Sequence, residues 1–280
     1  MNALDSPTTL GALLAQARER LGAPREANRL VGHALGMSLT VLYAHPERVV
    51  TAEEKQRALD LVDRRAGGEP VAYITGEREF HGLAFNITPA VLIPRPETEL
   101  LVELALERLP AGRESGVLDL GTGSGAIAVT IAHARPHAHI FAVDRSPEAL
   151  AVARGNACRH DLDNVAFVEG DWLAPFAGER FDFIISNPPY VAVGDPHLAQ
   201  GDLRFEPTLA LPSGRDGLDD LRRVIAAAPS HLRTNGWLIL EHGADQQPAV
   251  LELLSKHGFT ECEGHPDLAG LPRAVSARRR

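Results

Sequence analysis

The sequence has few of the residues that mark disulfide-bonded, nucleic-acid-binding or membrane proteins. Its 280 residues include two cysteines, Cys158 and Cys262, which lie far apart and form no CxxC pair. This predicts a reduced, cytoplasmic protein without a disulfide framework. No window holds 18 consecutive apolar residues, and the N-terminus has an early acid and no continuous apolar stretch, so we expect neither a membrane span nor a signal peptide. The formal net charge of −9 argues against nucleic acid as the main partner, because duplex binders usually present a basic surface.

The chain is nevertheless rich enough in apolar residues to bury a sizeable core. Hydrophobic residues make up 44% of it, and the length suits one large domain, alone or with a small one. Residues 1–75 are predicted to form a small helical domain, in which Thr51 and Glu54 occupy the positions of a capping box. We expect these helices to lack a strong core of their own and to dock onto another structure or onto a partner. Alternating aromatic and aliphatic residues around Gly82 predict a β-hairpin connector over residues 76–93.

The remaining residues, 94–280, alternate between apolar strands and helices. Strands are expected at 116–120, 139–143, 165–169, 181–186, 236–241 and 274–278, with helices such as 147–159 and 218–228 between them. This alternation is typical of an α/β fold, in which crossover helices cover a parallel sheet.

A glycine-rich loop follows the first of these strands. In the stretch VLDLGTGSGAIAVT, Gly121, Gly123 and Gly125 lead from the strand into a helix. Glycines allow the backbone to approach a ligand and to present N–H groups at a helix N-terminus. A tight strand-to-helix turn also needs glycine, so the loop alone does not establish a ligand site. No lysine follows, so the loop is not a phosphate-cradling P-loop.

Acidic and aromatic residues follow the next two strands. Asp144 ends one strand, where an acid can accept hydrogen bonds from ribose hydroxyls, or can instead cap the helix at Pro147. Ser146 is the better cap for that helix. Asp171 and Trp172 follow the third strand, where a carboxylate and an indole can bind and cover an adenine ring, although a lone tryptophan is more often core. Together these residues indicate a nucleoside-binding crevice.

The fourth strand ends in Asn187-Pro188-Pro189-Tyr190. The nitrogen of a planar amide or amine is a poor nucleophile, because its lone pair is conjugated. Two acceptors that hold its N–H bonds can orient it and favour the transition state. The Asn187 side-chain oxygen and the Pro188 carbonyl could be these acceptors, on a loop stiffened by proline, and Tyr190 could form a wall beside a flat group. An isolated Asn-Pro-Pro is more often a simple turn, but this position at a strand end favours a site.

These motifs resemble those of class I S-adenosylmethionine-dependent methyltransferases, and the Asn-Pro-Pro-Tyr motif is similar to that of enzymes methylating planar nitrogens. Nearly the whole chain resembles the bacterial release factor glutamine methyltransferases. The stretches that carry this resemblance are LIPRPETELLVE, DLGTGSGAIA, SNPPYV, FEPTLAL, GRDGL and LEHG followed by Gln246. One departure is Leu271-Pro272-Arg273, where the family commonly has a charged triplet.

The resemblance implies a Rossmann-like methyltransferase domain with a mostly parallel seven-stranded sheet, a small N-terminal helical domain that docks the substrate, and a connecting hairpin. It implies S-adenosyl-L-methionine as cofactor and methylation of N5 of the glutamine in the Gly-Gly-Gln motif of class I peptide chain release factors. Carried over by position, the cofactor-binding residues are Gly121, Thr122, Gly123, Ser124, Gly125, Asp144, Asp171, Trp172 and Asn187. The substrate-binding residues are Asn187, Pro188, Pro189 and Tyr190, with Asn187, Pro188 and Tyr190 catalytic. Arg95, Glu97 and Thr98 are expected near the mouth of the active site.

Other activities share parts of this pattern. A ribosomal-protein glutamine methyltransferase would have the same cofactor and Asn-Pro-Pro-Tyr elements. A nucleic-acid adenine N6-methyltransferase is disfavoured by the acidic charge and the lack of a basic recognition domain. A cofactor-binding scaffold without activity would not need the Asn-Pro-Pro-Tyr motif. We expect a monomer with no membrane and no stable nucleic-acid partner. We also expect no metal, since His133, His137 and His139 lack the spacing of metal ligands.

Overall fold

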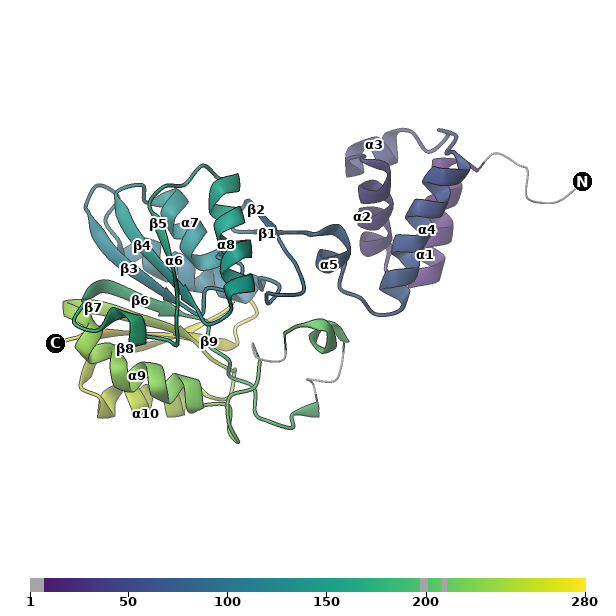
Figure 1. Cartoon of the computed structure of the whole chain (residues 1–280). Coiled ribbons are helices and arrows are strands. Elements are labelled where there is room, and N and C mark those ends of the chain that lie inside the picture. Colours follow the sequence, from purple (N-terminus) through teal and green to yellow (C-terminus); the bar gives the residue numbers. More distant parts are fainter. Residues whose placement is uncertain (1–7, 197–200, 208–210) are drawn as a thin grey trace, which may run out of the picture. The chain divides into compact units, whose positions relative to one another are not determined.

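The computed structural model describes residues 8–196, 201–207 and 211–280. The chain divides into two compact units. The first comprises Met1–Gly76 with Gln200–Phe205, and the second comprises Glu77–Ala199 with Glu206–Arg280. Figure 1 labels the elements of both.

The first unit is helical. Its elements are α1 (Leu10–Leu21), α2 (Pro24–Leu35), α3 (Leu39–Ala44), α4 (Ala52–Ala66), α5 (Val71–Thr75) and the short 3₁₀ helix η4 (Gly201–Phe205). The predicted capping box is confirmed, since Thr51 accepts from the Glu54 N–H and Glu54 accepts from the Thr51 N–H. These helices were expected to lack a strong core of their own, but they do share a buried core. Helices α1, α2 and α4 pack around a contiguous buried cluster that includes Leu13, Val31 and Val62.

The second unit contains a hairpin and a large sheet with helices. The strands are β1 (Glu77–Phe80), β2 (Leu83–Asn86), β3 (Ser115–Leu120), β4 (Ala138–Asp144), β5 (Val165–Glu169), β6 (Phe181–Ser186), β7 (Leu232–Glu241), β8 (Phe259–Pro266) and β9 (Pro272–Arg279). The helices are η1 (Pro96–Thr98), α6 (Glu99–Arg108), α7 (Ala126–Ala134), α8 (Pro147–Arg159), η2 (Ala174–Phe176), α9 (Asp219–His231) and α10 (Gln247–Lys256).

The large sheet has seven strands in the order β5-β4-β3-β6-β7-β9-β8. Strands β3 to β7 pair in parallel, whereas β9 runs antiparallel to both β7 and β8. The predicted parallel α/β sheet is therefore confirmed. None of the strands predicted individually from the sequence corresponds to β8. Helices α6, α7 and α8 lie on one face of the sheet and α9 and α10 on the other (Figure 1).

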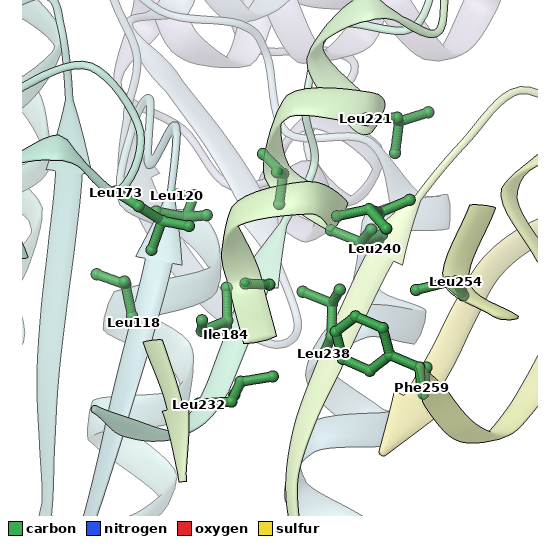
Figure 2. Close-up of a cluster of buried hydrophobic side chains, with 14 of the residues drawn as sticks. Leu118, Leu120, Leu173, Ile184, Leu221, Leu232, Leu238, Leu240, Leu254 and Phe259 are labelled. Atoms are coloured by element: carbon green, nitrogen blue, oxygen red, sulfur yellow. The ribbon is translucent and has the colours of Figure 1, made fainter. Parts of the chain in front are cut away.

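One hydrophobic core lies between the sheet and the layer of α9 and α10. Alternate residues of β3, β6 and β7, such as Leu118, Ile184 and Leu238, point toward Leu221 of α9 and Leu254 of α10 (Figure 2). A strand places every second side chain on the same face, so this alternation builds one continuous apolar layer. The strands that carry the loops of the site therefore pack on this layer.

Within the second unit, one buried side chain links the hairpin of β1 and β2 to α8. Asn156 of α8, which is fully buried, accepts from the Asn86 N–H at 2.7 Å and donates to the Asn86 carbonyl at 3.1 Å. The same Asn156 amide donates to the Ser124 carbonyl of the glycine-rich loop at 2.8 Å. Asn156 therefore couples the end of the hairpin to the loop that follows β3.

Candidate active site

The site lies where the order of the strands reverses. From β3, the chain continues to β4 and β5 on one side, while β6 and β7 lie on the other. Leu120, the last residue of β3, is paired with Ser186, the last residue of β6, and the Ser186 hydroxyl donates to the Leu120 carbonyl at 2.7 Å. Gly121 and Asn187 therefore leave the sheet side by side. Such a reversal point opens a crevice beyond the carboxyl ends of the strands.

The glycine-rich loop has the backbone geometry that its sequence predicts. Gly121, Gly123 and Gly125 have φ values of 71°, 56° and 81°, in the left-handed region that favours glycine. The space where a Gly123 Cβ would lie is open, whereas a Cβ on Gly125 would lie 3.1 Å from the Ala153 side chain. Gly123 thus leaves room at the cavity, and Gly125 permits close packing of α8.

Asp119 lies buried beneath this loop. Its Oδ2 accepts from the Thr122 hydroxyl at 2.6 Å, and its Oδ1 has no hydrogen-bond partner among the described residues. Burial raises the pKa of the Asp119 carboxyl to about 7, despite the opposing effect of the Thr122 hydrogen bond. Thr122 is thus used to hold the loop against Asp119.

Asp144 braces the loop from the neighbouring strand. Its carboxylate accepts from the Gly123 N–H at 2.9 Å and from the Ser146 N–H at 3.0 Å. Ser146 caps α8, as predicted, because its hydroxyl accepts from the Ala149 N–H at 3.1 Å. A carboxylate has about four acceptor positions, so Asp144 retains capacity for the hydroxyl groups of a ligand.

Asp171 and Trp172 form another part of the cavity wall. Trp172 has a φ of 53°, which is strained for a bulky side chain, and a Cβ on Gly121 would lie 3.4 Å from its ring. The indole therefore lies against the first glycine of the loop. Asp171 forms an exposed ion pair with Arg223 of α9.

Asn187 is held by a buried chain of hydrogen bonds. Its Nδ2 donates to the Thr98 hydroxyl at 3.1 Å, and that hydroxyl donates to Glu241 Oε2 at 2.7 Å. Tyr190 donates to the other Glu241 oxygen, Oε1, at 3.0 Å. Burial raises the pKa of Glu241 to about 7, although hydrogen bonds from Thr98 and Tyr190 lower it. Burial also raises the pKa of Tyr190, with the adjacent Glu241 charge acting in the same direction.

The loop after β6 is also braced through its backbone. Gln246 Nε2 donates to the Tyr190 carbonyl at 3.0 Å and to the Asp216 carbonyl at 3.2 Å, and its Oε1 accepts from the Gly243 N–H at 2.8 Å. Gln246 therefore joins the loops that follow β6 and β7 to the turn before α9. Gly217 of that turn has a φ of 75° and packs directly on the Tyr190 carbonyl.

The predicted site residues divide between the cavity wall and its support. Those that line the cavity are Gly121, Gly123, Asp144, Asp171, Trp172, Asn187 and Pro189. Thr122, Ser124, Gly125, Pro188 and Tyr190 are not among the lining residues. Lining residues that the sequence analysis did not identify are Ala90, Val91, Leu92, Val143, Arg145, Ser146, Ala149, Gly170, Pro207 and Asp220. Leu92 and Pro207 lie within LIPRPETELLVE and FEPTLAL, two of the stretches that carry the family resemblance. The resemblance could therefore have identified these two residues.

The residues of the PRPETE stretch have separate contacts. Thr98 is buried and contacts Asn187, as described above, whereas Arg95 Nη2 donates to both carboxylate oxygens of Glu206 at 2.7 Å. The Glu206 side chain is fully buried, and Pro207 beside it lines the cavity. Arg95 therefore anchors a second loop at the cavity. Glu97 contributes a charge near Glu241.

Metal and membrane features are absent from the part of the chain that the structure describes. Among residues 8–196, 201–207 and 211–280, no group of three His, Cys, Asp or Glu side chains could hold a metal ion. Within the same residues, no helix is both long and apolar enough to cross a membrane.

Comparison with solved structures relates the fold to that of methyltransferases. The catalytic domain of human Mettl16, in complex with a MAT2A hairpin, superposes with a TM-score of 0.57 at 17% identity, covering 80% of this chain and 79% of that one. The Thermus thermophilus 16S rRNA N2 G1207 methyltransferase, solved with AdoMet and guanosine, has a TM-score of 0.54 at 23% identity. The match covers 73% of this chain and 50% of that one. At these identities the likeness concerns the fold.

Sequence relatives are much closer. A protein of Xylella fastidiosa strain Temecula1 is 50% identical over 267 residues, covering 95% of this chain and 97% of the relative. Relatives from Burkholderia pseudomallei and Pseudomonas aeruginosa are 51% and 47% identical, covering 90% and 95% of this chain and 91% and 97% of the relatives. All three are named release factor glutamine methyltransferase. The family model for the PrmC N-terminal domain matches residues 12–76, and a methyltransferase domain model matches residues 112–264. The chain therefore belongs to the release factor glutamine methyltransferase family.

Proposed function

We propose that this protein transfers a methyl group from S-adenosyl-L-methionine to N5 of the glutamine in the Gly-Gly-Gln motif of class I peptide chain release factors. The family supports the substrate. The observation that carries the chemistry is the position of Asn187, which lines the cavity next to Gly121 while its Nδ2 is bonded to Thr98. Its oxygen is then available to accept an N–H of a planar amide.

The cavity residues fit the proposed cofactor. The carboxylates of Asp144 and Asp171 can accept from ribose hydroxyls and from an exocyclic amine, and the Trp172 ring offers a flat apolar surface. At Gly123 the chain leaves open space where any side chain would begin. When bound, S-adenosylmethionine supplies an electrophilic methyl group.

The residues after β6 would orient the nucleophile. The Asn187 oxygen and the Pro188 carbonyl each accept one N–H of the glutamine amide, which fixes the nitrogen and stabilises the positive charge that develops on it. Pro189, which lines the cavity, offers a wall beside the flat amide group, and Tyr190 supports the loop through its hydrogen bond to Glu241. None of these residues acts as a nucleophile, so the chain contributes positioning and electrostatic stabilisation.

The proposal is tested by measuring radiolabelled methyl transfer to three acceptors in parallel. These are a purified class I release factor, a ribosomal protein with methylatable glutamine, and DNA. We expect transfer to the release factor, lost when its Gly-Gly-Gln glutamine is replaced by alanine. Transfer to the ribosomal protein instead would establish the sister specificity, and transfer to DNA alone would refute a glutamine acceptor.

We further propose that the first unit docks the body of the release factor. A loop tip in a pocket supplies less than the roughly 800 Å² per partner of a standard interface, so a second contact surface is expected. Leu39 and Tyr43 of α3 are 50% and 61% exposed, which suits such a surface. Replacing both by serine should raise the KM for whole release factor but not for a short Gly-Gly-Gln peptide. Equal loss with both substrates would contradict docking.

A further inference from the structure

The side-chain amide of Asn187 can point either its oxygen or its NH₂ group into the cavity, and only the oxygen can accept a substrate N–H. We propose that Glu241 and Thr98 are positioning residues that set this choice. Neither lines the cavity, and both are buried, at 1% and 4% exposure. Thr98 would act through Asn187, and Glu241 through Thr98.

The orientation follows from counting protons along the chain of hydrogen bonds. An ionised carboxylate can only accept, and both oxygens of Glu241 face hydroxyl groups, of Thr98 and Tyr190. Whenever Glu241 is ionised, that is above its pKa of about 7, the single hydroxyl proton of Thr98 is therefore used on Glu241. The Thr98 oxygen can then only accept, so the side chain of Asn187 must present its NH₂ group to it.

The opposite orientation of Asn187 carries a cost. If its oxygen faced Thr98, the Thr98 proton would be required by two acceptors at once. Either Glu241 or Asn187 would then keep a buried oxygen without a donor. Leaving a buried polar group unpaired is unfavourable, and the cost is larger for a charged group such as the Glu241 carboxylate. No described residue donates to Asn187 Oδ1, so in the observed arrangement this oxygen remains for the substrate.

The register of the sheet explains why these residues meet. Ser186 of β6 is paired with Leu240 of β7, so the next residues, Asn187 and Glu241, leave adjacent strands together. Thr98 reaches the same point from η1, 143 residues away in sequence from Glu241. The stretches PRPETE and LEHG thus supply one hydrogen-bond chain that ends on the acceptor of the active site.

This inference rests on the proposed function and deepens it, and two Thr98 variants test it. Thr98→Ser keeps the hydroxyl, and Thr98→Val keeps the shape without it. We expect kcat for release factor close to wild type in Thr98→Ser and about 10²-fold lower in Thr98→Val, with KM for S-adenosylmethionine little changed in either. Equal kcat values in Thr98→Val and Thr98→Ser would overturn the proposal.

A second measurement does not depend on the methyl acceptor. In ¹⁵N-labelled protein, the side-chain NH₂ resonance of Asn187 is identified by its loss in Asn187→Ala. Its exchange with solvent should be slow in wild type and Thr98→Ser, and about tenfold faster in Thr98→Val. Equal exchange in all three would refute the hydrogen bond to Thr98. If the wild type transferred no methyl group to release factor, the proposed function would fail, while the exchange rates would still decide whether Thr98 positions Asn187.

Discussion

Replacing Gly217 by alanine should impair turnover far more than cofactor binding. Gly217 does not line the cavity, but it packs against the backbone that carries Tyr190. A Cβ at this position would lie 2.2 Å from the Tyr190 carbonyl oxygen and 2.7 Å from Gln246 Nε2. Real Cβ contacts are not shorter than 3.0 Å, so the carbonyl or the turn has to move by the difference between 3.0 and 2.2 Å, about 0.8 Å.

Such a displacement would reach the reacting groups directly. Tyr190 is three residues from Asn187, and the 3.0 Å hydrogen bond from Gln246 that holds its carbonyl would be broken. Since a misplacement of about 1 Å can reduce a rate by about 10²-fold, we expect kcat to fall by that order. The KM for S-adenosylmethionine should change much less. The assay is methyl transfer to release factor under saturation with each substrate in turn.

Gly178 provides the matched control. Its φ of 85° is close to the 75° of Gly217, but a Cβ there would meet nothing within 4 Å. Both alanine variants share the strain of a left-handed alanine, which costs about 1 kcal/mol of folding stability. Only Gly217→Ala adds the collision with Tyr190. If Gly217→Ala kept the kcat of Gly178→Ala in a folded protein, the role assigned to this turn would be wrong.

Two further predictions concern carboxylates. Asp144→Ala should weaken S-adenosylmethionine binding by about 1–3 kcal/mol in calorimetry, because it removes an acceptor and the brace on the Gly123 N–H; unchanged affinity would exclude this role. The pKa of Glu241 is raised to about 7 from 4.5, so its protonated form stabilises the fold below pH 4.5, and this contribution is lost as pH rises through 7. Relative to Glu241→Gln, the wild type should therefore lose on the order of 3 kcal/mol of unfolding free energy between pH 4.5 and 8. The kcat of the wild type should rise over the same pH range as the Glu241 carboxylate forms. Tyr190, Arg273 and Glu97 are the other groups that act on the pKa of Glu241. If the unfolding free energies of wild type and Glu241→Gln changed in parallel with pH, the raised pKa would be contradicted.

Local sequence signals predicted the regular elements well. Thr51 and Ser146 cap helices where their positions predict it, and apolar runs marked the parallel strands. Strand β8 was missed because Phe259–Pro266 is an edge strand with polar residues, a glycine and two register irregularities, so it lacks a clear apolar alternation. The core of the first unit was underestimated because individual helices do not reveal how completely α1, α2 and α4 cover one another.

The residues of the site were easier to predict than their connections. Strand ends in a parallel sheet meet at one edge, so Gly121, Asp144 and Asn187 could be placed together from sequence. The role of Glu241 could not, because it depends on which strand pairs with β6 and in what register. Thr98 was expected at the mouth of the site and is instead buried beside Asn187. Pairing over such sequence distances is set by tertiary packing, which leaves no local pattern.

The central claim is that the Asn187 oxygen orients the nitrogen that receives the methyl group. The most direct measurement compares Asn187→Ala with wild type in two assays, calorimetric binding of S-adenosylmethionine and single-turnover methyl transfer to a class I release factor. We predict that the transfer rate falls by about 10²–10³-fold, while cofactor affinity changes far less. A folded Asn187→Ala protein that binds the cofactor and methylates the release factor at a near-normal rate would contradict the account.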